Sequence, residues 1–283
     1  MKTSAELRVS LDQHRRGQLW PFQSGGLVTA TDSGMVLLGY RDPHAVDALE
    51  AFADDKGYVP QLCSPDQIEN HMPVSDFNRH WRQADYGTTC LVLALRREAG
   101  LPFDSRLRRV LQGILSGYEI RSGLYFANPY LTDWLLAMAL EPEEETAAAR
   151  STLAGEILAS AHDDGSFGAF DLALSTAFAL LTLSALGIGG KQFDAGRRFL
   201  AASIGEDGRW PAATPFYSSV ILPSEAFAAT KLMELAFGDR REQTTMIRTQ
   251  KSAGQIHAIT LYRDDAGLIP TAVAVLALHQ DVP

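Results

Sequence analysis

The chain has 283 residues, of which 46% are hydrophobic, and it carries a formal net charge of -9. This length is enough for one large domain with a sizeable core, or for two smaller domains. The acidic balance, without any block dense in lysine and arginine, disfavours nucleic acid as a partner, because phosphate binding needs a concentrated positive surface.

Helix-forming segments follow one another along most of the chain. Residues 5–15 predict a short polar helix, and Pro43 predicts a helix start just before 44–53, because proline is favoured in the first helical turn. Apolar residues at helical spacing predict the other helices, at 32–38, 85–97, 105–118, 132–140, 143–160, 171–186, 193–203, 224–237, 240–250 and 271–279. No strand is predicted, because the apolar runs are rich in alanine and leucine rather than in β-branched residues.

Residues 60–82 interrupt this rhythm. The segment reads PQLCSPDQIENHMPVSDFNRHWR, with three prolines, charges of both signs and no clean period. A loop of this length in a compact domain is often a lid or a binding loop. We expect an irregular insertion that covers one end of a cavity. A disordered surface segment is the alternative, against which Phe77 and Trp81 argue.

A short phrase recurs ahead of six apolar helices. Each copy has a glycine followed closely by an aromatic or apolar residue, as in Gly165-Ser166-Phe167, and the other copies begin at Gly17, Gly57, Gly123, Gly208 and Gly267. The helices after these turns are apolar on all sides, whereas the helices before them are amphipathic. A helix that is apolar all round is buried all round, and an amphipathic helix covers it from outside.

Six buried and about six covering helices that alternate in sequence predict an all-α fold, an (α/α)6 toroid. In this barrel of six helix pairs, two concentric rings form a single domain over residues 1–283. Repeats of about 20–50 residues usually build stacked architectures of this kind. A linear solenoid of helix pairs is the rival, but it would expose a polar face on both layers.

The repeated phrase resembles a known family. Asp164-Gly165-Ser166-Phe167 and Asp207-Gly208-Arg209-Trp210 look like the glutamine–tryptophan repeats of squalene–hopene cyclases and related triterpene cyclases, and the Thr-Ala-x-Ala run at 271–274 is similar too. The same α/α toroid carries the β subunits of protein prenyltransferases. The resemblance covers most of the chain apart from the insertion, and it implies a central cavity for an isoprenoid or polyene-like substrate.

The sequence lacks the signature motif of each reaction that these families catalyse. Class II terpene cyclases protonate an alkene with the middle acid of an Asp-x-Asp-Asp-Thr motif, but the nearest match, Asp85-Tyr86-Gly87-Thr88-Thr89, has Gly87 at that position. The acidic pairs, such as Asp163-Asp164, lack the third acid of the Asp-Asp-x-x-Asp motif that binds magnesium diphosphate in class I synthases. Asp85 and Cys90 do not match the Asp-x-Cys pair that binds zinc in prenyltransferases. We therefore expect neither a metal nor another cofactor.

An acidic residue recurs near the start of the apolar helices. Desolvation in an apolar pocket would raise the pKa of such a carboxyl and keep it protonated as a general acid. The alternative is that the carboxylate caps the helix and complements its dipole. As catalytic residues we predict first Asp85 and Asp171, then Asp133, with His80 as an acid–base partner of Asp85. For His80, a surface histidine is the alternative.

Aromatic and polar side chains near these acids are predicted to bind substrate: Trp81, Tyr86, Trp134, Phe170, Tyr217, Glu225 and Asp32. The aromatic residues of the repeated turns have a different expected role. They are expected to lock adjacent repeats together rather than touch a ligand: Trp20, Tyr58, Tyr125, Phe167 and Trp210.

The first functional interpretation is an enzyme that performs a non-redox, acid–base-catalysed cyclisation or isomerisation of an apolar substrate. A non-catalytic toroid that holds a lipid, an isoprenoid or a peptide is the alternative, and a zinc-dependent prenyltransferase-like protein is a third. An apolar small molecule is therefore the expected partner. Peripheral membrane contact is compatible with such a substrate, and the oligomeric state is left open.

The expected compartment follows from the cysteines and from the apolar runs. Two cysteines cannot form a disulfide framework and suit a reducing compartment. The N-terminal residues lack the apolar run of a signal peptide, and no stretch approaches about 18 uninterrupted apolar residues, as a membrane span requires. We expect a soluble, cytoplasmic protein.

Overall fold

The computed structural model describes residues 4–21, 27–60, 84–116, 125–222 and 256–280, with the backbone alone for 4–5, 217–222 and 256–262. Over these ranges the chain is mostly helical, with ten α-helices, one short 3₁₀-helix and two strands. The chain divides into two compact units, residues 1–118 and 119–283.

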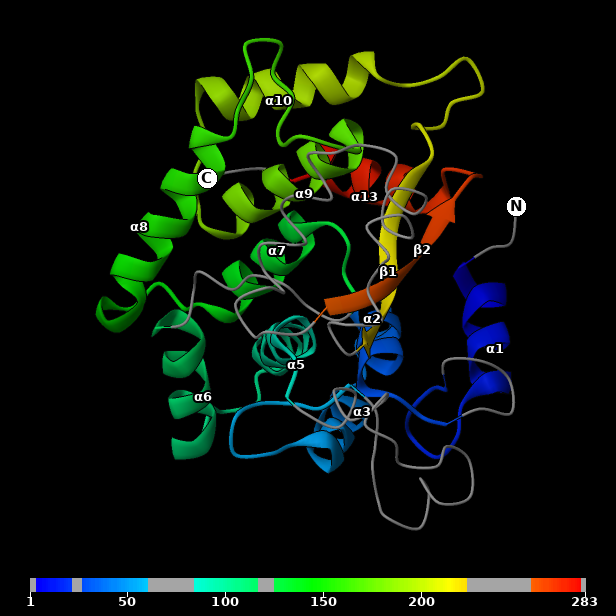
Figure 1. Ribbon diagram of the computed structural model, residues 1–283, viewed down its shortest axis with the longest axis vertical. Coiled ribbons are helices and arrows are strands. Elements are labelled where there is room, and N and C mark those ends of the chain that lie inside the picture. The colour runs from blue at the N-terminus through cyan, green and yellow to red at the C-terminus, as the bar shows by residue number, and fades with distance from the viewer. Residues whose placement is uncertain (1–3, 22–26, 61–83, 117–124, 223–255, 281–283) are drawn as a thin grey trace. The chain divides into compact units, whose positions relative to one another are not determined.

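The first unit is built around helix α5. Its elements are α1 (Ser4–His14), α2 (Ala30–Tyr40), α3 (Pro43–Ala48), η1 (Leu49–Phe52), α5 (Tyr86–Glu98) and α6 (Ser105–Ser116) (Figure 1). Residues 87–96 of α5 are all buried, whereas α6 buries one stripe. Helix α2 packs closely on α5, since a Cβ at Gly34 would lie 2.6 Å from Leu91 Cδ2.

The second unit is built in the same way around helix α9. Its elements are α7 (Pro129–Ala139), α8 (Glu144–Ala159), α9 (Leu172–Ala185), α10 (Lys191–Ala202), β1 (Ala213–Leu222), β2 (Ile256–Asp264) and α13 (Leu268–Leu278). Residues 173–183 of α9 are buried without a break. Figure 1 shows α9 beside α7 and α13, and it packs against both.

The predicted alternation of apolar and amphipathic helices is confirmed in the described ranges. The apolar helices α2, α5, α7, α9 and α13 begin within about three residues of their predicted starts, and α1, α3, α6, α8 and α10 also lie where helices were predicted. The helices predicted at 224–237 and 240–250, together with the insertion at 60–82, lie outside the described residues.

The prediction that the chain contains no strand is wrong. Strands β1 and β2 form an antiparallel pair that runs from Ala213 opposite Asp264 to Leu222 opposite Ile256. Apolar and polar residues do not alternate regularly in β1, because Ser218 and Ser219 interrupt the apolar positions. The two strands are also about thirty residues apart in sequence, so no short turn marks them as a hairpin.

The aromatic residue of each turn is joined to the helix that follows it. Its backbone N–H donates to a hydroxyl on the fourth or fifth residue of that helix: Trp20 to Ser33 (2.9 Å), Tyr58 to Thr89 (3.0 Å), Phe167 to Thr176 (2.9 Å) and Trp210 to Thr271 (3.1 Å). All four aromatic side chains are buried. We call this hydrogen bond between a turn and the helix that follows it the lock.

The turns also bind the amphipathic helices that precede them. The indole Nε1 of Trp20 donates to Leu11 O in α1, and that of Trp210 donates to Leu200 O in α10, each at 2.9 Å. The turn at Gly165 also closely approaches α10, which follows it in the chain, because Gly165 has a φ of 90° and a Cβ there would lie 2.5 Å from Ala195 O.

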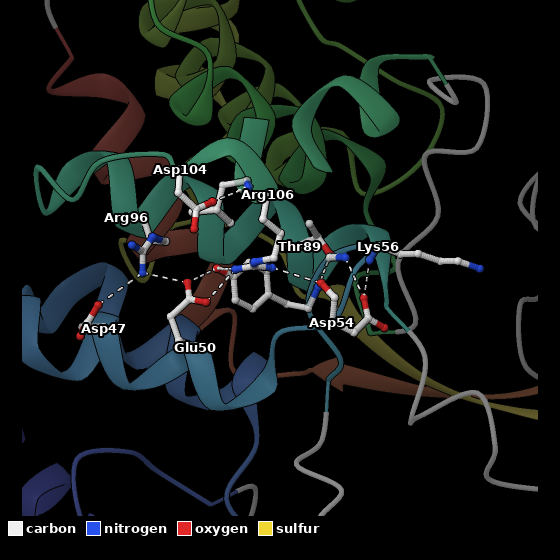
Figure 2. Close-up of polar contacts among 11 residues, drawn as sticks. Asp47, Glu50, Asp54, Lys56, Thr89, Arg96, Asp104 and Arg106 are labelled. Carbon is white, nitrogen blue, oxygen red and sulfur yellow. Dashed lines mark hydrogen bonds and ion pairs between the residues drawn. The ribbon is translucent and has the colours of Figure 1, made fainter. Parts of the chain in front are cut away.

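An ionic cluster around Glu50 holds the corresponding turn of the first unit (Figure 2). The Glu50 carboxylate lies 2.9 Å from Arg96 Nη1 and 2.7 Å from Arg106 Nη2. It also accepts the hydroxyl of Tyr58, while Arg106 Nη1 donates to Asp54 O at 3.1 Å. Since these groups belong to η1, to the turn and to both α5 and α6, the cluster has a structural role.

Arginines of the amphipathic helices occupy the C-terminal ends of the apolar helices in the second unit. Arg150 of α8 donates to Leu140 O, at the end of α7, and to Leu186 O, at the end of α9, at 2.8 and 2.9 Å. Arg197 of α10 donates to Leu278 O in α13 at 2.8 Å. These contacts satisfy C-terminal carbonyl groups. The acids predicted to act in catalysis lie at the opposite, N-terminal ends.

Candidate functional site at the start of α7 and α9

Asp85 is the N-cap of α5. Its Oδ2 accepts the backbone N–H of Thr88 at 2.7 Å and the Thr88 hydroxyl at 2.8 Å. The Thr88 hydroxyl also lies 2.9 Å from the hydroxyl of Thr31 in α2, and all three side chains are buried. Helix capping, the alternative stated for these acids, thus accounts for Asp85.

Asp32 belongs to a reciprocal cap at the start of α2. Thr29 is the N-cap, and its hydroxyl accepts the Asp32 N–H at 3.1 Å and donates to the Asp32 carboxylate. Burial raises the pKa of Asp32 above its ordinary value, although the hydrogen bond from Thr29 opposes this shift. The arrangement is close to a capping box, which explains an acid at the third helical position.

Capping does not explain Asp133. The N-cap of α7 is Asn128, whose side-chain oxygen accepts the N–H of Tyr130 at 3.0 Å. Asp133 lies one turn farther along the helix and is only 2% exposed. Its neighbour Trp134 stacks on Phe178 of α9, with ring centroids 5.8 Å apart. A buried carboxyl thus lies beside an aromatic pair that joins the two helices.

Asp171 lies at the N-cap position of α9, but its side chain makes no capping hydrogen bond. Instead its Oδ2 accepts the backbone N–H of Thr214, in β1, at 2.7 Å. Burial raises the pKa of Asp171 above its ordinary value, against the smaller effects of the Thr214 hydrogen bond and the Arg263 charge. Asp171 also has a left-handed backbone, with φ 42°, which is uncommon for a residue other than glycine and is often found at functional sites.

The loop that carries Asp171 is held from several sides. The Ser175 hydroxyl donates to Phe170 O at 2.8 Å, and it accepts from Asn128 Nδ2, at the start of α7, at 2.9 Å. On the other side of the loop, His162 Nε2 lies 2.6 Å from Gly168 O. The position of the Asp171 carboxyl is therefore well defined.

The first residues of β1 cross these helix starts. Phe216 packs on Phe126, just before α7, with ring centroids 6.2 Å apart, and Ala127 N donates to Pro215 O at 3.1 Å. We call the group formed by the helix starts and the strand the α7–α9 site: Asn128, Asp133, Asp171, Ser175, Thr214 and Phe216. The site contains two acids that do not cap their helices, and it also contains aromatic rings.

Of the residues predicted from sequence, Asp133, Trp134, Phe170 and Asp171 belong to the α7–α9 helix pair. Tyr217 lies in β1, where its backbone pairs with Leu261. Asp32, Asp85 and Tyr86 belong to the first unit, at the starts of α2 and α5. The other three, His80, Trp81 and Glu225, lie outside the described residues.

Sequence reasoning missed Asn128, Ser175 and Thr214. Asn128 followed by Pro129 is a recognisable helix start, since asparagine is favoured at the N-cap and proline at the next position. Thr214 carries no local signal, because its contact with Asp171 depends on the path of β1.

Within the described ranges, no three histidine, cysteine or acidic side chains gather as a metal ion would need. No helix in that part of the chain combines the length and the apolar character required to cross a membrane.

No protein-family model and no curated protein matches the chain. Solved structures do resemble it. A protein from Actinoplanes is 20% identical over 98% of this chain and 82% of its own, with a TM-score of 0.64. The type II terpene cyclase MstE from Scytonema, without ligand, is 16% identical over 96% of this chain and 79% of its own, with a TM-score of 0.66. A variant of MstE in complex with its substrate, geranylgeranyl dihydroxybenzoate, covers 96% of this chain and 78% of its own, with 16% identity and a TM-score of 0.63. The chain thus has a terpene-cyclase-like fold.

Proposed function

We propose that this chain is a terpene-cyclase-like enzyme that cyclises or isomerises an apolar isoprenoid or polyene without redox chemistry. We further propose that its six helix pairs close into an (α/α)6 toroid around the substrate. The fold supports this assignment, and so do the ligands of MstE, which is bound to geranylgeranyl dihydroxybenzoate as substrate and to merosterolic acid A as product.

The observation that carries the proposal is the carboxyl of Asp171. It is partly buried, its burial raises its pKa, and it makes no capping hydrogen bond to its own helix. A raised pKa makes a carboxyl better suited to act as a general acid. Gly87 replaces the usual donor of the family motif in α5, so another acid has to supply the proton.

In the proposed reaction Asp171 protonates one carbon of an alkene, and the positive charge develops on the other carbon. Successive alkenes then attack the cation and form the new rings. The final cation then loses a proton to the Asp171 carboxylate left by the first step, which restores the acid and gives a product with the same mass as the substrate. The aromatic pairs Trp134–Phe178 and Phe126–Phe216 present π faces that stabilise a nearby cation. Asp133 is the second acid of the proposed site.

We also propose roles for the other residues predicted from the sequence. Asp85 and His80 would form an acid–base pair, although capping is the simpler role for Asp85. The proposed substrate-binding residues are Trp81, Tyr86, Trp134, Phe170, Tyr217, Glu225 and Asp32.

Incubation with geranylgeranyl dihydroxybenzoate tests the proposal. Liquid chromatography with mass spectrometry should detect an isomer of unchanged mass, and NMR should show that it has fewer alkene protons. Asp171→Asn keeps the shape of the side chain but removes the transferable proton, so turnover should fall by about 10²–10⁴-fold. Asp163→Asn is the matched control, because Asp163 is exposed in a turn of the same unit and should leave turnover unchanged.

Two results would contradict this assignment. Full turnover in both Asp171→Asn and Asp133→Asn would exclude the proposed acids. Tight binding of the isoprenoid by the wild-type protein, without any isomer being formed, would favour the non-catalytic binding protein.

A further inference from the structure

Strand β1 has a bulge where it meets the α7–α9 site. Ala213 pairs with Asp264 and Phe216 pairs with Tyr262, so Thr214 and Pro215 together face one residue of β2, Arg263. Such a bulge places an extra residue on one strand and is often found next to active sites. Here the N–H of Thr214 is directed to Asp171 rather than to β2. The bulge therefore brings Arg263 close to the proposed catalytic acid.

Arg263 can accept a new anionic partner. Its Nε lies 2.7 Å from Asp265 Oδ1, but the side chains of Arg263 and Asp265 are 66% and 82% exposed. An ion pair so open to water contributes little stability. A ligand carboxylate can therefore replace Asp265 as the partner of Arg263 at little cost in free energy. Burial disfavours the charged form of Asp171, although the Arg263 charge favours it to a smaller extent.

Two aromatic rings lie next to the bulge that faces Arg263. Phe216 follows the bulge in β1 and packs on Phe126, and both rings lie at the start of α7. A ligand with its charged end at Arg263 would thus have its first apolar atoms beside an aromatic pair. This arrangement of a cation next to aromatic rings suits an amphiphilic molecule.

We propose that Arg263 binds the carboxylate of an isoprenoid acid, with the apolar tail directed into the α7–α9 site. This inference rests on the proposed function, because it assumes that the site takes an isoprenoid. Arginine suits a carboxylate, since its planar guanidinium can donate two parallel hydrogen bonds.

The local charge favours a carboxylate over a diphosphate. Asp264 and Asp265 follow Arg263 directly in the sequence, and the nearby Arg209 is paired with Asp207. A ligand with several negative charges would be repelled by these acids. A single negative charge matches the one available guanidinium.

Calorimetric titration with farnesoic acid and with farnesol separates the head group from the tail. The wild-type protein should bind the acid about three- to tenfold more tightly than the alcohol, as expected for a charge-assisted contact open to water. Arg263→Gln should reduce the affinity for the acid to that for the alcohol and leave farnesol binding unchanged. Arg263→Lys should restore part of the difference.

Arg209→Gln is the matched control. Arg209 is 52% exposed, pairs with an aspartate two residues away as Arg263 does, and donates to Ala266 O in the turn next to Arg263. The variant should bind both ligands like the wild-type protein. This result would show that disturbing the turn does not by itself weaken the binding of farnesoic acid.

Three outcomes would overturn the inference. If farnesoic acid binds no better than farnesol, or if Arg263→Gln weakens both equally, Arg263 does not recognise the carboxylate, while the proposed function stands. If farnesyl diphosphate binds more tightly than farnesoic acid, the head group is a phosphate. If neither farnesol nor the acid binds, the proposed function fails as well.

Discussion

Asp85 and Asp171 lie at equivalent ends of two apolar helices, but their carboxyls have different surroundings. Asp85 accepts both the amide and the hydroxyl of Thr88 within its own helix. Asp171 has a left-handed backbone, which turns its carboxyl away from α9 and toward the N–H of Thr214. The backbone conformation, rather than the residue type, therefore separates an acid that caps its helix from one that does not.

The raised pKa of Asp171 predicts how its replacement changes stability with pH. The folded state binds this proton more tightly than the unfolded chain, so the carboxyl contributes less to stability as the pH rises from about 4, its ordinary pKa, through the raised value. Asparagine is neutral at every pH. The free energy of unfolding of Asp171→Asn, relative to wild type, should therefore increase with pH over this window and then become constant.

Urea unfolding of both proteins between pH 4 and 8 measures this difference. Taking the difference removes the contributions of the other acids, among them Asp32, whose pKa is also raised, and Asp164, whose pKa is lowered. A difference that stays flat or falls as the pH rises would mean that the fold favours the ionised carboxylate, and Asp171 would then be unsuited to donate a proton.

At the scale of elements, the same lock joins turn and helix in both units. A hydroxyl near the start of an apolar helix satisfies the backbone N–H of the preceding aromatic residue, and this residue is buried in four described repeats. A buried N–H without a partner lowers the stability of the fold, so the hydroxyl that accepts this N–H stabilises the protein. This explains why serine and threonine occur among otherwise apolar residues.

Two threonines of α9 test this role. Thr176 accepts the N–H of Phe167 at 2.9 Å, whereas Thr182 only donates to Phe178 O, a carbonyl within the same helix, at 2.8 Å. Both are fully buried. Thr176→Val should lower the free energy of unfolding by about 1–3 kcal/mol, because it leaves a buried N–H without an acceptor. Thr182→Val should cost less than about 1 kcal/mol in urea unfolding. Equal costs for the two variants would refute the lock.

Local patterns predicted these helices but not the strands. α5 and α9 are long apolar runs, and their burial on all sides follows from their composition alone. β1 depends on β2, about thirty residues farther along, and on Phe126 and Asp171, which belong to other segments. For the same reason Asp171 was predictable as a candidate acid, whereas Thr214, its partner, was not.

At the scale of the molecule, an apolar helix requires neighbours on every side. In α13 the side chains of Leu268, Val275 and Leu276 are 61%, 43% and 42% exposed, although the opposite side of the helix is buried. A unit that ends in such a helix exposes apolar surface, and contact between this surface and water is unfavourable. One side of α13 is therefore both apolar and exposed.

Hydrogen exchange measured in increasing urea tests whether the chain is one cooperative domain. The slowest amides of α5 and of α9 lie in the buried centres of the two units, so each reports the free energy of unfolding its own unit. If both units belong to one closed ring, these amides should give the same free energy within about 0.5 kcal/mol and the same dependence on urea. Amides of α1, at the edge of the first unit, should exchange through smaller local openings and serve as the internal control. If α9 stays protected at a urea concentration where α5 has lost its protection, the units unfold separately, and the single-domain toroid is incorrect.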